Sequence, residues 1–395
     1  MSLVDLFARE YDSPAIMHYP VGELLRGTVS VKRGSDGWLR PWRLTEAQRR
    51  VLLSCRAWHP GLFRQMAACT AGICLEFETD AHQIALEIRL DAEPQGTTKV
   101  LELVDASIAP SRQTHDGVSC EVDGLHLPYR MPIVSTEFDS SQEPVALVGF
   151  DIAPGEQNQI PGLGTRRRVT LRLPSLRGCE LRDLLCDGTY VEPCEKRPKL
   201  LVIGDSVAQG FVADDPAWAW PSLLASALGL ELVNQGIGGE VFQPGFVADV
   251  ASQLSCEHVV VALGANYRFE RCSASIVAAE IRAFLGELES FGSETNIWIV
   301  SPVWLDRIMW PAHPHSCIDQ LEALLTDALK RHEGWHFVSG KELMDQESYL
   351  LAEDACHPGP FGHEQIAERL AARMSKSENR EHPQPQHQSA ESSSR

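Results

Sequence analysis

Several features that would point to common kinds of partner are missing from this sequence of 395 residues. Basic residues are few, 35 Lys and Arg against 54 Asp and Glu, so the formal net charge is -19 and phosphate backbones and anionic membrane surfaces would repel the chain. No uncharged apolar run is long enough to span a bilayer, and the first residues contain no apolar segment of the signal-peptide kind. We therefore expect no nucleic-acid partner, no membrane association and a cytoplasmic location.

Disulfide, metal and cofactor motifs are also lacking. The eleven cysteines are an odd number without CxxC spacing, which is typical of reduced thiols rather than of a disulfide framework. There is no glycine-rich phosphate loop, nicotinamide fingerprint or EF-hand spacing. His313, His315 and Cys317 lie close together in HPHSC, but Pro314 and the lack of a second cluster favour a loop over a metal site. We expect chemistry that needs neither a metal nor a cofactor.

The first half of the chain has the period of β-strands. From about Gly72 to Leu173, apolar and polar residues alternate in short runs, which are separated by turn-rich segments. The runs are ICLEFE, HQIALEIRL, KVLELV, GVSCEV and RRVTLRLP. This pattern predicts an all-β sandwich domain over residues 1–197. A domain of this size can bury its own core, so a fragment that begins near Arg197 need not unfold merely because the sandwich core is gone.

The periodicity changes after Lys199. Apolar strands now alternate with helical stretches, an order that predicts a parallel sheet with right-handed crossovers. The strands are LLVI, LELV, HVVVAL and NIWIVS, and the helical stretches are 217–228, 273–290, 315–332 and 361–374. From residue 375 onward the chain has almost nothing to bury. We predict an α/β domain over residues 198–374 and a disordered tail over 375–395.

Polar residues follow three of these strands, at the edge where open parallel sheets bind ligands. Asp205 and Ser206 follow the first strand, Asn234 and three glycines in NQGIGGE follow the second, and Asn266 in GAN follows the third. Each segment alone has an ordinary explanation, because Asp and Ser cap helices and glycines form tight turns. Together they place a hydroxyl and several amide donors at one edge of the sheet.

A fourth segment, DACHPGPFGHEQIAERL, supplies an acid and a base. Asp354 precedes His357 by three residues, so a short turn brings the carboxylate to Nδ1 and leaves Nε2 to take a proton from a hydroxyl. With Ser206 as nucleophile, these are the groups that acyl transfer requires. Cys356 is beside His357, but neighbours in sequence seldom point at each other, so we interpret it as a packing thiol.

The blocks GDS, NQGIGGE, GAN and DACH, the last followed by PGPFGHEQIA, resemble those of the SGNH (GDSL) hydrolase superfamily in order and approximate spacing. The resemblance covers roughly residues 198–374 and implies an SGNH/flavodoxin-like domain with three layers. It assigns Ser206, Asp354 and His357 to a catalytic triad. It assigns the oxyanion hole to the N–H groups of Ser206 and Gly239 and the side-chain amide of Asn266.

Two details of the resemblance concern the loops. Many members of the superfamily have GxND in the third block, whereas Tyr267 follows Asn266 here. We place the oxyanion donor at Gly239, five residues after Asn234, and keep Gly238 as the alternative. Among the aromatic residues in the loops, we expect Tyr267 and Trp304 to line the substrate pocket.

The β-rich half resembles, more loosely, the sandwich or jelly-roll domains that precede some bacterial SGNH enzymes. These include carbohydrate acetyl esterases and an acyltransferase of antibiotic biosynthesis. The resemblance implies a serine esterase that hydrolyses a small polar acyl ester, such as an O-acetylated carbohydrate, through an acyl-enzyme. Two alternatives stay open, namely acyl transfer to a small-molecule alcohol and a non-catalytic glycan-binding protein. The expected partner is a small-molecule ester, and the oligomeric state does not follow from the sequence.

Overall fold

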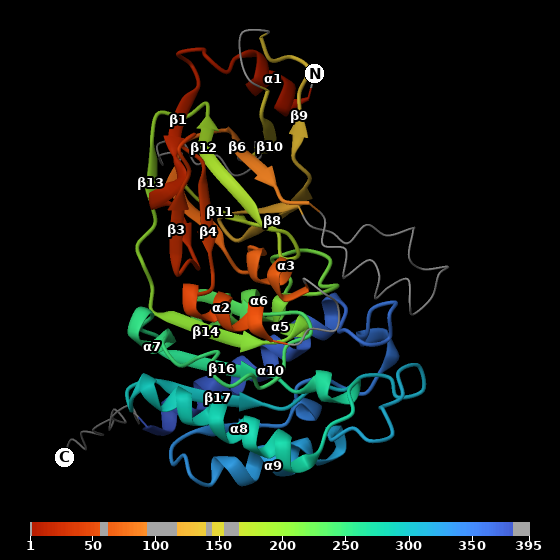
Figure 1. Cartoon of the computed structure of the whole chain (residues 1–395). Helices are drawn as coiled ribbons and strands as arrows, with labels where there is room; N and C mark the ends of the chain where they lie inside the picture. Colours follow the sequence, from red (N-terminus) through yellow and green to blue (C-terminus); the bar gives the residue numbers. More distant parts are fainter. Residues whose placement is uncertain (1, 56–61, 93–116, 140–143, 154–165, 382–395) are drawn as a thin grey trace, which may run out of the picture.

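The chain folds into a β-sandwich followed by an α/β half with a parallel sheet (Figure 1). The structure is a computed structural model that describes residues 2–55, 62–92, 117–139, 144–153 and 166–381. This arrangement confirms the fold class expected from the sequence, an all-β sandwich in front of a three-layer α/β domain. No helix in the described ranges is both long and apolar enough to cross a membrane.

Two antiparallel sheets form the sandwich. Sheet A runs in the order β3 (Ser30–Arg33), β4 (Leu39–Trp42), β12 (Cys179–Cys186), β6 (Gln83–Leu90), β10 (Ala146–Asp151) and β9 (Ile133–Val134), with β1 (Met17–Pro20) also paired to β12. Sheet B runs in the order β13 (Val191–Pro193), β5 (Cys74–Thr79), β11 (Arg167–Arg172), β7 (Val118–Val122) and β8 (Leu125–Arg130), with β2 (Leu25–Arg26) paired to β5. Helix α1 (Leu3–Arg9) packs on β10 and β6 of sheet A.

The alternating runs in the sequence become β5, β6, β7 and β11, as predicted. Their inward-facing residues, among them Phe77, Ile88, Cys120 and Leu171, share one core between the two sheets. The turn EVDG joins β7 to β8, and its Asp123 and Gly124 both have positive φ, 50° and 83°, as a tight hairpin requires. The fifth run, KVLELV, lies outside the described residues.

The α/β half is built on sheet C. Its parallel strands are β15 (Glu231–Gly236), β14 (Lys199–Gly204), β16 (His258–Ala262), β17 (Asn296–Val300) and β18 (His336–Val338), in this order. The order is that of a flavodoxin-like sheet, in which β14 is the first strand and the switch point of the strand order lies between β14 and β16. Four of these strands were predicted, and β18 was not.

Helices cover both faces of sheet C. One face packs on α8 (Ala274–Leu288) and α9 (Leu321–Leu329), and the other packs on α6 (Trp220–Leu228) and α10 (Pro360–Glu381). The remaining short helices of this half are α5 (Ser206–Gln209), α7 (Val250–Gln253), η3 (Ala265–Arg268), η4 (Glu289–Phe291), η5 (Ile318–Gln320), η6 (Gly340–Glu342) and η7 (Ser348–Leu350). Helix α10 runs past Ser375, so residues 375–381 are helical instead of part of the expected tail, of which 382–395 lie outside the described residues.

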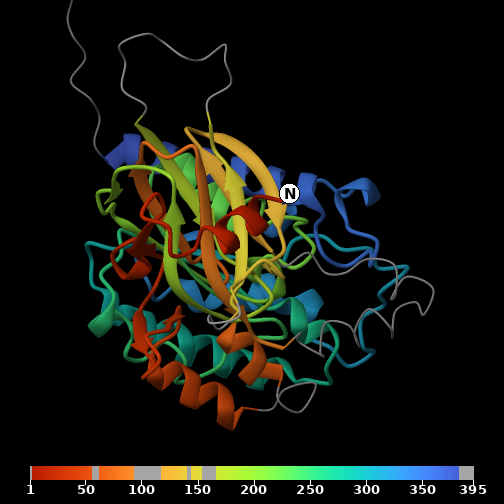
Figure 2. The ribbon, with the colours of Figure 1, turned by 90° about the horizontal axis from the view of Figure 1, so that it is seen from above.

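Two helices of the N-terminal half belong to the α/β layers. Helices α2 (Glu46–Ser54) and α3 (Leu62–Ala68) follow β4 and lie at the edge of the sandwich, against the α/β half (Figures 1 and 2). Leu52, Phe63 and Met66 are buried in the same core as Val233 of β15 and Val261 of β16. One hydrophobic core thus contains residues of both halves, although the sandwich also has a core of its own. The shared core argues against the expectation that a fragment from Arg197 folds alone.

Arg43 joins the halves at this point. Its side chain is fully buried, and burial lowers its pKa to about 10, so it is still a cation at neutral pH. The guanidinium donates to the carbonyls of Met66 (2.7 Å) and Cys69 (2.8 Å) in the N-terminal half. It also donates to the carbonyls of Asn234 (2.9 Å) and Gly236 (2.6 Å) at the end of β15.

We predict that Arg43→Met lowers the free energy of unfolding by about 3 kcal/mol or more, because the buried carbonyls left without donors cost about 1–3 kcal/mol each. Arg50→Met is the matched control, since Arg50 on α2 is largely exposed and forms an ion pair with Glu46. It should change the free energy of unfolding by less than about 0.5 kcal/mol. Urea unfolding of the full chain measures both, and equal midpoints for the two variants would contradict this role of Arg43.

Candidate active site

Ser206 lies at the carboxyl edge of sheet C. Strand β14 is almost wholly buried and ends at Gly204, where a Cβ would lie only 2.4 Å from the Cβ of Ala208, so α5 turns back directly onto the strand. Asp205 caps this helix, and its Oδ1 accepts from the N–H of Val207 at 3.1 Å. Ser206 is the first residue of the helix, so its N–H is among those that the helix leaves without an internal partner.

His357 connects Ser206 to Asp354. Its Nε2 lies 2.8 Å from Oγ of Ser206, and its Nδ1 lies 2.6 Å from Oδ2 of Asp354. The other carboxylate oxygen of Asp354 accepts from the N–H groups of Cys356 (3.0 Å) and His357 (2.9 Å), which fixes the turn before α10. A proton on Nδ1 satisfies Asp354 and leaves Nε2 to accept from the serine hydroxyl. The structure brings together the three residues predicted as a triad.

The charges around His357 favour its protonated form. Burial alone would lower the pKa of His357, but its contact and hydrogen bond with Asp354, together with the nearby Asp205, raise the pKa above its ordinary value. Burial opposes ionisation of Asp354, yet the attraction of His357 and the hydrogen bonds from the turn hold the pKa of Asp354 below its ordinary value. Burial raises the pKa of Asp205 to about 6. An imidazolium formed during a reaction would be stabilised here.

The candidates for an oxyanion site are the N–H groups of Ser206 and Gly239 and the side-chain amide of Asn266. Gly238 is not among them, because its N–H donates to Oε1 of Gln209 at 2.8 Å. Among the described residues, the Gly239 N–H has no hydrogen-bond acceptor, and the φ of 88° at Gly239 is one that glycine adopts readily. Asn266 on η3 donates one amide hydrogen to the carbonyl of Glu240 at 2.8 Å, which orients the amide and leaves its second hydrogen for a ligand. The geometry favours Gly239 over Gly238.

Glu240 shows how the site avoids an opposing charge. Its side chain is fully buried directly after Gly239, and Oε2 has no hydrogen-bond partner among the described residues. Burial raises the pKa of Glu240 to about 8, so the carboxyl is mostly neutral at pH 7. A neutral Glu240 adds no negative charge beside the position where an oxyanion would form.

His363 and Phe211 support His357, and the sequence analysis did not identify either. Phe211 stacks on the His357 ring with centroids 5.5 Å apart and an interplanar angle of 25°. Fully buried His363 accepts from the N–H of Trp220 and contacts the carbonyl of Phe211 through Nε2, each at 3.2 Å. Burial lowers the pKa of His363 to about 4, so it is neutral and keeps this tautomer. The sequence signal that could have identified His363 is the GH of PGPFGHEQIA, in which this histidine follows His357 by six residues.

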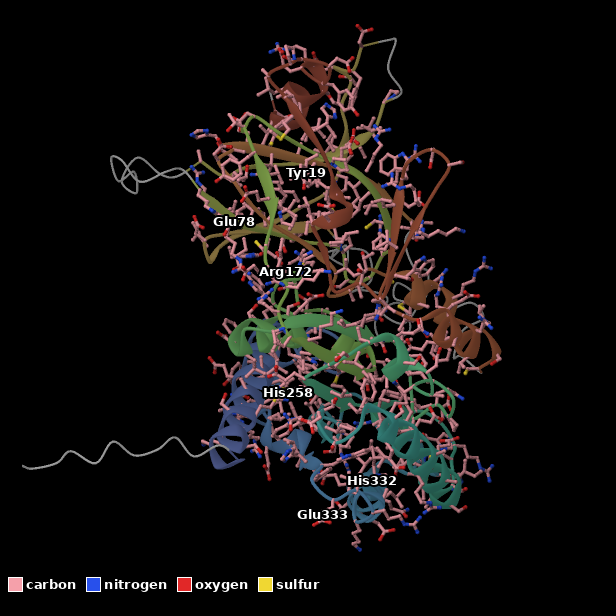
Figure 3. The ribbon with its side chains drawn as sticks, turned by 90° about the vertical axis from the view of Figure 1, so that its left-hand side faces the viewer. Tyr19, Glu78, Arg172, His258, His332 and Glu333 are labelled. Carbon is pink, nitrogen blue, oxygen red and sulfur yellow. The ribbon has the colours of Figure 1, made fainter. Side chains whose placement is uncertain are left out.

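The sandwich reaches the site through Gln209, a contact that sequence reasoning also missed. Gln209 accepts from Gly238 and donates to the carbonyl of Ser175 at 3.0 Å, in the segment between β11 and β12. Elsewhere along the junction, Asp215 accepts from the N–H of Tyr129 on β8 at 3.2 Å. Arg172 lies at the same junction (Figure 3), where its Nη2 is 3.3 Å from Oγ of Ser226 on α6. Residues of the sandwich thus fix the position of these segments of the α/β half.

Of the two aromatic residues expected in the pocket, the structure places one beside a cavity. Trp304 lines a cavity of about 300 Å³ together with residues of η3 and α9, although Ser206 is not part of its wall. Tyr267 instead points into the core, where it is 5% exposed and donates to Glu280 on α8 at 2.7 Å. Tyr267 therefore does not line the substrate pocket, because its ring fills the space between η3 and α8.

The structure gives no support for a metal site at His313 and His315 or for a reactive thiol at Cys356. The N–H of His315 donates to Nδ1 of His313 at 3.1 Å within their loop. Within the described ranges, no group of three or more His, Cys, Asp and Glu side chains is arranged to hold a metal ion. Burial raises the pKa of the Cys356 thiol to about 12, which argues against a reactive thiolate.

Comparisons with solved structures show a shared fold. The salicylyl-acyltransferase SsfX3 from a tetracycline biosynthetic pathway is 20% identical, with a TM-score of 0.69 over 92% of this chain and 95% of that one. An acetyl xylan esterase (Est2A) from Butyrivibrio proteoclasticus is 12% identical, with a TM-score of 0.56 over 92% and 99% of the two chains. A family two carbohydrate esterase from Cellvibrio japonicus is 12% identical, with a TM-score of 0.56 over 91% and 97%.

A search of curated protein sequences finds no significant match. The profile of the GDSL-like lipase/acylhydrolase family matches residues 202–365, from β14 into α10. The matched segment includes Ser206, Gly239, Asn266, Asp354 and His357. Residues 202–365 of this chain thus form a GDSL-like lipase/acylhydrolase domain, and this match supports a carboxylic ester hydrolase.

Proposed function

We propose that the protein is a serine esterase that hydrolyses a small polar acyl ester through an acyl-enzyme. The observation that carries the proposal is the chain of contacts from Ser206 Oγ to His357 Nε2 at 2.8 Å and from Nδ1 to Asp354 at 2.6 Å. Among the described residues, the N–H of Gly239 and the second amide hydrogen of Asn266 have no acceptor. A protein that only bound glycans would have no use for this arrangement.

In this mechanism Ser206 Oγ attacks the ester carbonyl while His357 takes its proton at Nε2. The resulting oxyanion accepts from the N–H groups of Ser206 and Gly239 and from the amide of Asn266. Asp354 stabilises the imidazolium, which then gives its proton to the departing alcohol. Water, deprotonated by His357, attacks the acyl-enzyme and releases the carboxylic acid and free Ser206.

An O-acetylated carbohydrate is the substrate class that we infer first. Support comes from the carbohydrate esterases among the similar structures, which have a TM-score of 0.56 over nearly the whole chain. The protein also has eleven free thiols, which suit a reducing compartment such as the cytoplasm. In that compartment the substrate would be a small acetylated sugar or a similar metabolite.

Transfer of the acyl group to a small-molecule alcohol is the second candidate, because the salicylyl-acyltransferase has the higher TM-score of 0.69. The same groups serve both reactions, and the outcome depends on whether water or an alcohol reaches the acyl-enzyme. Product analysis with p-nitrophenyl acetate and increasing concentrations of sugar or phenol acceptors distinguishes them. Free acetate as the dominant product at all acceptor concentrations supports hydrolysis, whereas acetylated acceptor supports transfer.

We predict that Ser206→Ala lowers kcat/KM for p-nitrophenyl acetate at least about 10³-fold, because the nucleophile is lost. A serine-directed phosphonate should label Ser206 in the wild-type protein, as peptide mass spectrometry can determine. Ser252→Ala, which removes an exposed hydroxyl on α7, is the control and should keep both activity and labelling. Labelling of a different residue, or an active Ser206→Ala variant, would refute the assignment of the nucleophile.

We also predict that kcat/KM rises with pH through a pKa above the ordinary His value of about 6.5, because His357 must be neutral and its pKa is raised. Asp354→Asn removes the contact that raises this pKa, so burial should then lower it. The rate should fall about 10³- to 10⁴-fold at the same time. Asp345→Asn, which removes a half-exposed carboxylate paired with Arg369, is the control. An unchanged profile in Asp354→Asn would exclude Asp354 from the triad.

A further inference from the structure

The wall of the cavity beside Trp304 contains more positively charged than negatively charged side chains. It lies between η3, the loop after β17 and the start of α9, and its volume is about 300 Å³, in the range of small-molecule sites. Apolar residues form much of the wall. The charged residues that line it are three cations, Arg268, Arg307 and Lys341, and two carboxylates, Asp319 and Glu322.

Two of the cations already have partners. Arg307 pairs with Asp319 at 2.5 Å, and both side chains are exposed. Lys341 pairs with Glu322 at 3.0 Å, and Glu322 also accepts from the hydroxyl of Ser339 at 2.6 Å. Both carboxylates of the wall are therefore paired with other cations, and neither forms an ion pair with Arg268.

Arg268 is also the most buried of the three cations. It is 3% exposed, and the only hydrogen bond from its side chain to the described part of the chain runs from Nη2 to the carbonyl of Trp310. No described carboxylate lies within ion-pair distance, and its Nε is buried without a partner. Burial lowers the pKa of Arg268, although the charges of Asp319 and Asp306 oppose this shift. A buried guanidinium with unused donors is costly unless a ligand supplies the acceptor.

The position of Arg268 connects the cavity to the reacting groups. It stands two residues after Asn266 on the same turn of η3. The residue whose carbonyl it binds, Trp310, donates from its indole to the carbonyl of Asp354 at 2.5 Å. Arg268 thus lies between the turn that carries an oxyanion donor and the turn that carries the acid and the base.

We propose that Arg268 binds a carboxylate of the substrate, so that the enzyme prefers acidic esters. The inference rests on the proposed esterase function and narrows its substrate class. The apolar or aromatic body of such an ester would lie against Trp304 and Leu305, which line the same cavity. A guanidinium suits this task, because its planar set of donors matches the geometry of a carboxylate.

The rival explanation is that Arg268 only positions the Trp310 loop. A positioning role would lower the rates for charged and neutral esters by the same factor. Direct recognition would lower only the preference for the charged ester. The ratio of kcat/KM for two esters that differ in one charge separates the roles, whatever loss the two esters share.

The experiment compares 4-acetoxybenzoate with its methyl ester, which have the same scissile acetate. The wild-type protein should prefer the acid, and Arg268→Gln should lower the ratio of kcat/KM for acid over ester about tenfold to a hundredfold. Arg268→Lys keeps the charge but loses the planar set of donors, so it should retain only part of the preference. Lys330→Gln, which removes an exposed cation at the end of α9, is the control and should leave the ratio unchanged. Mono-4-nitrophenyl succinate against 4-nitrophenyl butyrate tests a carboxylate on the acyl side.

A ratio that stays constant in Arg268→Gln, with both substrate pairs, would overturn the proposal. Titration of the wild-type protein with benzoate gives a second readout that needs no turnover. Benzoate should bind the wild type and bind Arg268→Gln at least tenfold more weakly, and equal affinity would also overturn the proposal. If neither ester is hydrolysed and the phosphonate leaves Ser206 unlabelled, the esterase function fails, while the benzoate titration still decides the role of Arg268.

Discussion

The buried guanidinium of Arg43 is the interaction on which the rest of the structure depends. It carries a charge into a junction that, in the described part of the chain, offers it no carboxylate, and four backbone carbonyls take its donors. Two of these carbonyls belong to the segment around α3, and the other two belong to Asn234 and Gly236. Because a guanidinium is planar and rigid, it fixes the position of the end of β15 relative to α3. The loop that presents Gly239 starts from that point.

This constraint explains why the active site belongs to both halves of the chain. Helices α2 and α3 complete the hydrophobic layer over β15 and β16, which α8 and α9 cover further along the sheet. Gln209 then connects the glycine loop to Ser175 of the sandwich, and Gln48 on α2 donates to Gln235 on β15 at 2.7 Å. The sandwich is therefore a structural part of the catalytic half, whether or not it touches the substrate.

The sequence predicted those parts of the fold and site that repeat a pattern. Four strands of sheet C were visible as apolar runs, and three of them were followed by a polar block. Strand β18 was missed because it has three residues and only Val338 is buried. Tyr267 was placed wrongly because its position in the chain does not reveal which way a side chain on a tight turn points. The outcome at Tyr267 was decided by packing against α8.

Other residues at the site had no pattern that could be read. Arg43 is one basic residue in PWRLTE, and nothing local distinguishes it from an exposed arginine. Gln209 follows the GDS block by three residues, but its partners are Gly238 and Ser175, which are distant in sequence. Contacts between distant segments also decided between Gly238 and Gly239. The reacting residues of the site were therefore predictable from local motifs. The residues that position them were not, because they act through tertiary contacts.

The central claim is that the α/β half needs the N-terminal segment to form its core and its oxyanion loop. The direct measurement compares the full chain with a fragment of residues 197–381, using urea unfolding and the rate at which a serine-directed phosphonate labels Ser206. Since the fragment lacks Arg43, Leu52, Phe63 and Met66, it should show no cooperative unfolding transition and no labelling under conditions where the full chain shows both. A fragment that unfolds cooperatively and is labelled at the rate of the full chain would contradict the account.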